Sequence, residues 1–380
     1  MTVTRNTVSN SPTANGIDVS DPFGFGPNTA VNISGNNVSG MLNGIAAQAG
    51  SLTDTLILSG NTVSNNTNGI HLTGVTASVV GGNDINGNTG AGILVDGGAN
   101  VTVNNGASPA IRNNFVGIDV NGGTANITGV ALNNNTTAVR VMGGGNATLT
   151  SNTFNGNSVG LVAQNGSATF TNGHHIDGIA VGNGGLVTVN TGGSNLIVTT
   201  SLTITGSGKL DVNDNDMIVD YSGASQRAAI QALINSARSG GTWTGSGLTS
   251  TAAKNRVPQN TTLGVLEATE YKSLYGAGAT FNGESIDNTA ILIKYTYYGD
   301  TDFNGVVNFD DYSRTDNGFS TGKSGWLNGD FDGNGIVNFD DYSLIDLAFN
   351  TQSGSLRPGE ASPRQGGKPG SKPAALPNLN

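Results

Sequence analysis

Residues 61–72 read NTVSNNTNGIHL and combine the two local features that decide the fold, an Asn-rich corner and a short strand. In the strand part, Ile70 and Leu72 alternate with the polar His71. Alternation with a period of two is typical of a strand with one buried face. Asn enters the left-handed backbone conformation of sharp corners more readily than most residues do. The stretch therefore predicts one corner and one strand of a larger, repeated unit.

The same corner and strand recur through the first 200 residues. Repeats of about 22 residues with Asn/Gly corners and without helical periodicity favour a mostly β fold, a right-handed parallel β-helix over residues 1–205. Asn side chains stacked at equivalent corners are expected to hydrogen-bond into ladders. Successive strands begin near Asn15, Asn43, Asn68, Ala91, Val116, Thr137, Val159 and Asp177, at intervals of 28, 25, 23, 25, 21, 22 and 18 residues.

A calcium β-roll is the alternative solenoid. It requires repeated G-G-x-G-x-D nonapeptides, and only residues 81–84, GGND, come near that pattern. The coils instead resemble the widespread family of secreted β-helix proteins related to pectate lyases and surface adhesins. The resemblance implies export, and either an adhesive role or action on a polysaccharide.

Two twelve-residue segments near the C-terminus match an EF-hand-type calcium loop. Loop 1, residues 300–311, reads DTDFNGVVNFDD, and loop 2, residues 330–341, reads DFDGNGIVNFDD. In such loops, side-chain oxygens at positions 1, 3 and 5, a carbonyl at 7, a water-linked group at 9 and a carboxylate at 12 surround one Ca²⁺. The predicted ligands of two calcium ions are therefore Asp300, Asp302, Asn304, Val306, Asn308, Asp311, Asp330, Asp332, Asn334, Ile336, Asn338 and Asp341.

Position 12 of both loops is Asp where the common pattern has Glu, and a helix is predicted only on the C-terminal side of each loop. On these features residues 299–350 resemble a type I dockerin, the tandem calcium module of bacterial extracellular proteins. The resemblance implies a cohesin-like partner. We expect the position-8 residues, Val307 and Val337, to bridge the loops by a short strand contact. Loop 2 is expected to hold its ion more firmly, because Gly333 replaces the bulky Phe303 of loop 1, and the module is expected to fold only with calcium.

Residues 206–298 differ in composition from the repeats. Within them, Ile230, Leu233, Ile234 and Ala237 have helical spacing in a predicted helix over residues 225–238, and a strand is expected from residue 290 to 298. The segment resembles a linking domain that precedes dockerin-type repeats in large secreted planctomycete proteins, for which no activity is implied. Residues 351–380, rich in Pro, Gly, Ser and Lys, predict a disordered tail.

Composition argues against a membrane-spanning protein and against a nucleic-acid-binding protein. The chain has no Cys, a formal net charge of −10 and only 11% charged residues. No stretch approaches the roughly 18 apolar residues that a membrane span needs. An acidic chain without basic stripes is a poor binder of nucleic acid. Residues 300–350 hold ten Asp against Arg314 and Lys323, so the acidity is concentrated where the metal is predicted. We expect a secreted or cell-surface protein.

The solenoid sequence offers only scattered candidates for catalysis. Asp18 and Asp119 occupy outward strand positions, where a lone solvated carboxylate is expected, and Gly173-His174-His175 resembles a hydrolase motif only loosely. We therefore predict a non-catalytic scaffolding, adhesive or docking protein. A polysaccharide lyase or glycoside hydrolase is the alternative, favoured by a compact cluster of three or more carboxylates and an Arg on one face. The other acidic and basic candidates are Asp96, Asp177, Arg112, Arg140, Glu267, Glu270, Glu284 and Asp287.

The chain begins inside a coil, since Asn6–Asn10 followed by Asn15 repeats the pattern of residues 61–68. This predicts a C-terminal fragment of a longer protein. An open coil presents unpaired backbone groups, so end-to-end self-association is expected. The partners predicted from the sequence are thus a cohesin-like protein or a cell-surface polysaccharide, and further copies of the chain.

Overall fold

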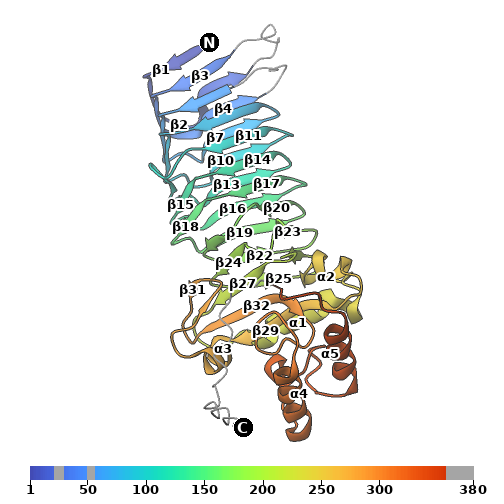
Figure 1. The fold of residues 1–380 in the computed structure, drawn as a ribbon. Coiled ribbons are helices and arrows are strands. Elements are labelled where there is room, and N and C mark those ends of the chain that lie inside the picture. The colour runs from blue at the N-terminus through green and yellow to red at the C-terminus, as the bar shows by residue number, and fades with distance from the viewer. Residues whose placement is uncertain (21–29, 49–55, 357–380) are drawn as a thin grey trace, which may run out of the picture.

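The computed structural model describes residues 1–20, 30–48 and 56–356. They form a parallel β-solenoid of about eight turns, followed by a mixed part that carries the helices at one end of the stack (Figure 1). None of the described helices is long and apolar enough to cross a membrane.

One face of the solenoid is an eleven-stranded parallel sheet. Its strands, in order, are β1 (Thr2–Thr4), β3 (Val31–Ser34), β5 (Leu56–Ser59), β8 (Thr76–Val80), β11 (Asn100–Asn104), β14 (Thr124–Thr128), β17 (Asn146–Thr150), β20 (Ser167–Phe170), β23 (Leu186–Val189), β26 (Lys209–Asp211) and β28 (Gly247–Thr249).

A fourteen-stranded sheet forms two further faces, joined through the long strands β2 (Thr7–Ser20) and β4 (Asn37–Gln48). From β4 one branch runs through β6 (Thr62–Ser64), β9 (Asp84–Asn86), β12 (Ile111–Arg112), β15 (Ala131–Asn133) and β18 (Thr153–Asn155). The other runs through β7 (Asn68–Thr73), β10 (Ala91–Asp96), β13 (Val116–Asn121), β16 (Thr137–Met142), β19 (Val159–Gln164), β22 (Ile179–Val181) and β25 (Leu202–Ile204).

The repeated Gly-Ile pair is explained by how the coils stack. Ile70 of β7 pairs in register with Ile45 of β4 and Ile93 of β10, and all three side chains are fully buried. The preceding glycine lies against the next coil, and a Cβ on Gly69 would stand 2.5 Å from the carbonyl oxygen of Gly92. The close approach therefore requires Gly at this position.

Buried Asn side chains form the expected ladders along the axis. The Oδ1 atom of Asn88 accepts the backbone N–H of Asn66 at 3.0 Å and its side-chain amide at 3.1 Å. Asn88 in turn donates to Asn114 Oδ1 at 2.8 Å. This ladder comprises Asn66, Asn88, Asn114, Asn135, Asn157 and, at its end, Asp177. A second ladder comprises Asn6, Asn36, Asn61, Asn83 and Asn105.

A five-stranded sheet closes the solenoid and connects it to the C-terminal part. Its parallel strands β21 (His174–Ile176), β24 (Leu196–Thr199) and β27 (Asp216–Asp220) are followed by the antiparallel strands β32 (Ala290–Tyr297) and β29 (Thr261–Glu267). Strands β26 and β28 continue the eleven-stranded sheet of the solenoid beyond residue 205. The sequence repeat fades there because the coils no longer share one corner motif.

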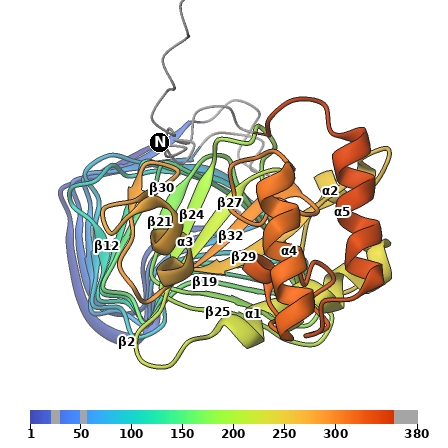
Figure 2. The ribbon, with the colours of Figure 1, turned by 60° about the horizontal axis from the view of Figure 1, so that its bottom comes forward.

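Helix α1 (Arg227–Arg238) matches the predicted helix, and Ile230 and Ile234 are buried in the solenoid core. The remaining helices are α2 (Thr251–Asn255), α3 (Ala268–Tyr275), α4 (Phe309–Thr321) and α5 (Phe339–Thr351), with 3-10 turns η1 (Ser239–Gly241) and η2 (Trp326–Asn328) and a hairpin of β30 (Thr280–Phe281) and β31 (Glu284–Ser285). Figure 2 shows α4 and α5 side by side, beyond the five-stranded sheet.

Residues 299–350 do not have a core of their own. Phe303 and Ile345 share one buried cluster with Phe281, Leu292 and Trp326. Residues 206–298 therefore supply part of the apolar support of the predicted calcium loops.

The first residues of the predicted tail, 351–356, are described, and they contact loop 1. Helix α5 ends at Thr351, and the backbone N–H of Leu356 donates to the carbonyl of Gly305 at 2.8 Å. The rest of the predicted tail, residues 357–380, lies outside the described residues.

The ladder yields a first prediction. Replacing the buried Asn88 by Ala removes the acceptor of two Asn66 donors, and buried polar groups left unpaired cost about 1–3 kcal/mol each. We expect Asn88→Ala to lower the free energy of unfolding by about 3 kcal/mol in urea titrations. The matched control is Asn126→Ala on β14, where the side chain is exposed and the cost should be within about 0.5 kcal/mol. Equal losses in the two variants would contradict a structural role for the ladder.

Candidate metal centre

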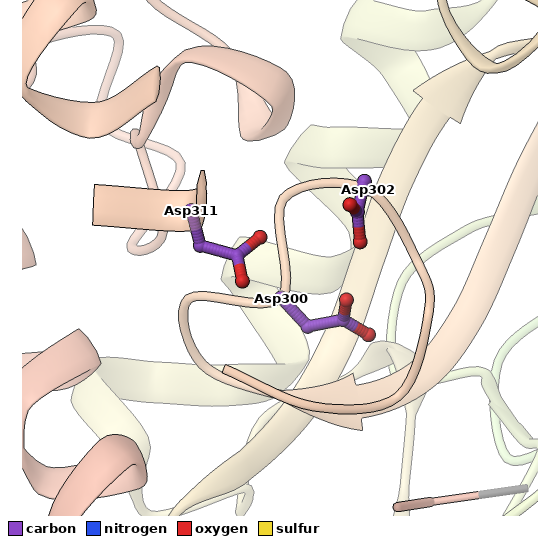
Figure 3. A group of neighbouring side chains, drawn as sticks. All are labelled: Asp300, Asp302 and Asp311. Atoms are coloured by element: carbon purple, nitrogen blue, oxygen red, sulfur yellow. The ribbon is translucent and has the colours of Figure 1, made fainter. Parts of the chain in front are cut away.

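Loop 1 gathers three carboxylates between β32 and α4. Asp300, Asp302 and Asp311 each offer an oxygen, and these oxygens all lie within 4.8 Å of one another (Figure 3). All three residues are buried. Asp311 enters the group from the first turn of α4, where it also forms a capping box with Asn308.

Loop 2 repeats the arrangement between η2 and α5. Asp330, Asp332 and Asp341 again bring oxygens within 4.8 Å, although Asp332 is less buried than its counterpart in loop 1. A groove of about 630 Å³ lies between α1 and loop 2, and Asp330 and Asn334 are part of its lining. Among the described residues, the only groups of three or more His, Cys, Asp or Glu side chains arranged to hold a metal are these two.

Backbone N–H groups fix one oxygen of each position-1 carboxylate. Gly305 N–H donates to Asp300 Oδ2 at 3.0 Å, and Gly335 N–H donates to Asp330 Oδ2 at 3.1 Å. The other oxygen, Oδ1, is buried and has no hydrogen-bond partner in either residue. Because buried polar atoms are nearly always paired, the same orphaned atom in both loops fits a bound cation.

Burial makes the negative charge in the loops costly. It raises the pKa of Asp300 well above the usual range, with the charges of Asp311 and Asp302 adding to the effect. Burial, with the charge of Asp302, also raises the pKa of Asp311 to about 6. In loop 2 burial raises the pKa values of Asp330 and Asp341. A divalent cation would offset this repulsion.

The other predicted ligands shape the loops. Asn304 Oδ1 accepts the N–H of Val306, and Asn334 Oδ1 accepts that of Ile336, both at 2.9 Å. At position 9, Asn338 Oδ1 accepts the N–H of Asp340 and caps α5, as Asn308 caps α4. The carbonyl groups of Val306 and Ile336 remain predicted ligands. The identity of the ion is likewise a prediction.

Phe303 does not crowd loop 1, contrary to the expectation from its size. Its backbone is left-handed, with φ of 65°, and its ring is fully buried with its centroid 6.2 Å from that of Phe281 and 6.3 Å from that of Trp326. Gly264 of β29 provides the space for this ring, since a Cβ at Gly264 would lie 2.6 Å from the rings of Phe303 and Trp326. Phe303 therefore anchors loop 1 to the linking segment.

The expected contact between Val307 and Val337 is also absent among the described strands and bridges. The side-chain amide of Gln352 occupies that edge of Val307 instead. Gln352 Oε1 accepts the N–H of Val307 at 2.8 Å, and Gln352 Nε2 donates to its carbonyl at 2.7 Å. Sequence reasoning missed Gln352 because nothing in its local pattern sets it apart.

Two of the solenoid candidates lie in register on neighbouring coils. Asp119 is not the lone solvated carboxylate that was expected, because its side chain is only 7% exposed and pairs with Arg140 at 2.5 Å. On the same face His71 Nε2 lies 2.9 Å from Asp96 Oδ2. The pairing arises because parallel register places residues of adjacent coils opposite each other.

The remaining candidates have separate partners. Asp177 and His174 accept hydrogen bonds in the corner ladders, from Asn157 and Asn152 respectively. The other pairs are Asp18 with Asn15, Arg112 with Asp84, Glu267 with Tyr221, Glu270 with Arg227, Glu284 with His175 and Asp287 with Thr289.

Comparison with known proteins defines the class of the solenoid. Residues 1–108 match the protein family described as "Right handed beta helix region". Together with the stacked parallel coils, this match supports a right-handed parallel β-helix for the solenoid. No curated protein and no solved structure matches the chain.

The raised pKa values predict how the metal-free protein responds to pH. The folded pKa of Asp311, about 6, lies above the unfolded value of about 3.9, so its contribution is complete below pH 4 and is lost as pH rises through about 6. We expect the helical circular-dichroism signal of the chelator-treated protein to report about 2 kcal/mol less stability at pH 7 than at pH 4 from this group. Asp311→Asn should flatten that difference, and parallel profiles for the two proteins would contradict the assignment.

Proposed function

We propose that loops 1 and 2 each bind one calcium ion, and that the chain is a secreted or cell-surface calcium-binding β-helix protein with a structural, adhesive or docking role. The observation that carries the calcium proposal is the pair of orphaned Oδ1 atoms, on Asp300 and Asp330, each inside a group of three carboxylates. All the proposed side-chain ligands are oxygen donors, the type that Ca²⁺ prefers.

Calcium would add to contacts within the chain that already hold the C-terminal fold together, rather than create that fold. The carbonyl of Asp300 accepts the indole N–H of Trp326 at 2.7 Å, and the carbonyl of Asp302 accepts the hydroxyl of Tyr275 at 2.8 Å. These bonds tie loop 1 to η2 and α3. Binding of an ion to the carboxylates would stabilise the end of the solenoid along with the loops.

The docking role is supported by the outer surface of α4 and α5. Phe309 and Phe339, at equivalent positions in the two helices, are 78% and 76% exposed. The ring of Phe309 lies tilted against that of Phe349, and the ring of Phe339 lies tilted against that of Phe319, so each end of the helix pair carries an aromatic cluster. Exposed aromatic clusters are typical of protein interaction sites. We propose a cohesin-like protein as the partner there, with a cell-surface polysaccharide as the alternative ligand of the solenoid.

Calorimetric titration of the whole chain tests the calcium proposal. We expect two calcium ions per chain, with Asp300→Ala and Asp330→Ala each removing one. Calcium at one hundred times Kd should add about 2.7 kcal/mol of stability per site. The control is Asp340→Ala, which removes an exposed carboxylate next to Asp341 and should leave two ions bound. Heat of calcium binding that persists in the double variant Asp300→Ala/Asp330→Ala would overturn the proposal.

An enzyme acting on polysaccharide is the second candidate, favoured by the His71–Asp96 and Asp119–Arg140 pairs on one solenoid face. Both carboxylates already have partners. The face also carries Asp18, but on β2, with β4 and β7 between it and β10, so Asp18, Asp96 and Asp119 do not form a compact cluster with Arg140. We therefore expect no turnover of pectin, alginate or a glucan in the presence of calcium. Turnover that disappears in both Asp96→Ala and Asp119→Ala would establish the enzyme instead.

A further inference from the structure

The two loops are not equivalent in charge. Both are followed by the sequence Tyr-Ser, after which loop 1 has Arg314 where loop 2 has Leu344. Arg314 Nη1 lies 3.3 Å from Asp302 Oδ2, 3.6 Å from Asp311 Oδ1 and 3.1 Å from Thr301 Oγ1. Leu344 packs instead against the buried cluster that contains Phe281 and Trp326. The carboxylates of loop 1 thus face a fixed cation that Leu344 does not supply at the equivalent position after loop 2.

We propose that Arg314 is a tethered cation that competes with calcium for loop 1, so that loop 1 is the weaker and calcium-responsive site while loop 2 stays filled at lower calcium concentrations. The inference rests on the proposed calcium binding. It concerns how that binding is regulated, and the pattern of ligand residues in the sequence does not predict this regulation.

The physical basis is the permanent charge of the guanidinium group. Arg stays protonated in proteins, so it cannot lose its charge when an ion arrives. Without calcium it offsets the repulsion between Asp302 and Asp311. With calcium it repels the ion across a distance of a few ångströms, in a site where burial limits screening by water and salt. One side chain therefore stabilises the metal-free loop and weakens the metal-bound loop.

These opposite effects distinguish competition from an ordinary structural role. Arg314→Leu, which copies loop 2, should lower the melting temperature of the protein in excess chelator. The same change should raise the calcium affinity of loop 1 about tenfold. A residue that only supports the loop would lower both quantities when removed. Arg314→Lys keeps the charge but loses the planar fork, and should leave the affinity much nearer to that of the unaltered protein.

The test is calorimetric titration of the full chain with calcium chloride in an Asp341→Ala background, which leaves loop 1 as the intact site. Arg314→Leu in that background should tighten binding. The converse variant, Leu344→Arg in an Asp311→Ala background, should weaken binding at loop 2. Added salt should reduce the difference made by Arg314, since part of the interaction is screened.

The outcomes separate the inference from the proposed function. Calcium binding at loop 1 with an unchanged or weaker affinity in Arg314→Leu would overturn the role of Arg314 while leaving the calcium sites in place. Lack of calcium binding at both loops of the unaltered protein would overturn the proposed function, and the inference with it. A tighter loop 1 accompanied by a lower melting temperature in chelator is the result that we expect.

Discussion

Every buried polar atom needs a partner, and this requirement governs both halves of the protein. In the solenoid the partner comes from the next coil, as when Asn88 accepts both donors of Asn66 and donates to Asn114. In the loops the backbone satisfies one oxygen of Asp300 and one of Asp330 and leaves the other without a partner. The ladder atoms of the solenoid are thus satisfied within the chain, whereas the orphaned loop atoms support the proposed calcium sites.

The two halves are also connected mechanically. Helix α1 buries Ile230 in the solenoid core, and on its other side Asn235 donates to the carbonyl of Gly333 in loop 2 at 2.7 Å. Loop 1 is anchored through Phe303 in the core that includes the five-stranded sheet. A change in loop 2 therefore affects α1, and a change in loop 1 affects the five-stranded sheet that closes the solenoid. We infer that calcium binding and the stability of this end of the stack are coupled.

The sequence predicted the parts of the structure that repeat. The Asn-Gly-Ile spacing indicated the coils, because a glycine such as Gly69 allows successive coils to approach closely, and the Asp spacing brought three carboxylates together in each loop. It did not predict contacts set by register or by distant segments. Asp119 meets Arg140 because 21 residues separate equivalent positions of two coils, and Phe303, with a left-handed backbone, packs beside Phe281 and Trp326.

The most direct test of the account is a crystal structure of the whole chain grown with calcium, with the ions located by anomalous scattering. The account predicts one ion in each loop, bonded to Oδ1 of Asp300 and of Asp330 at about 2.3–2.6 Å. It also predicts that the guanidinium of Arg314 withdraws from Asp302 and Asp311. Loops in which Oδ1 of both residues binds only water, with Arg314 still against the carboxylates, would contradict it.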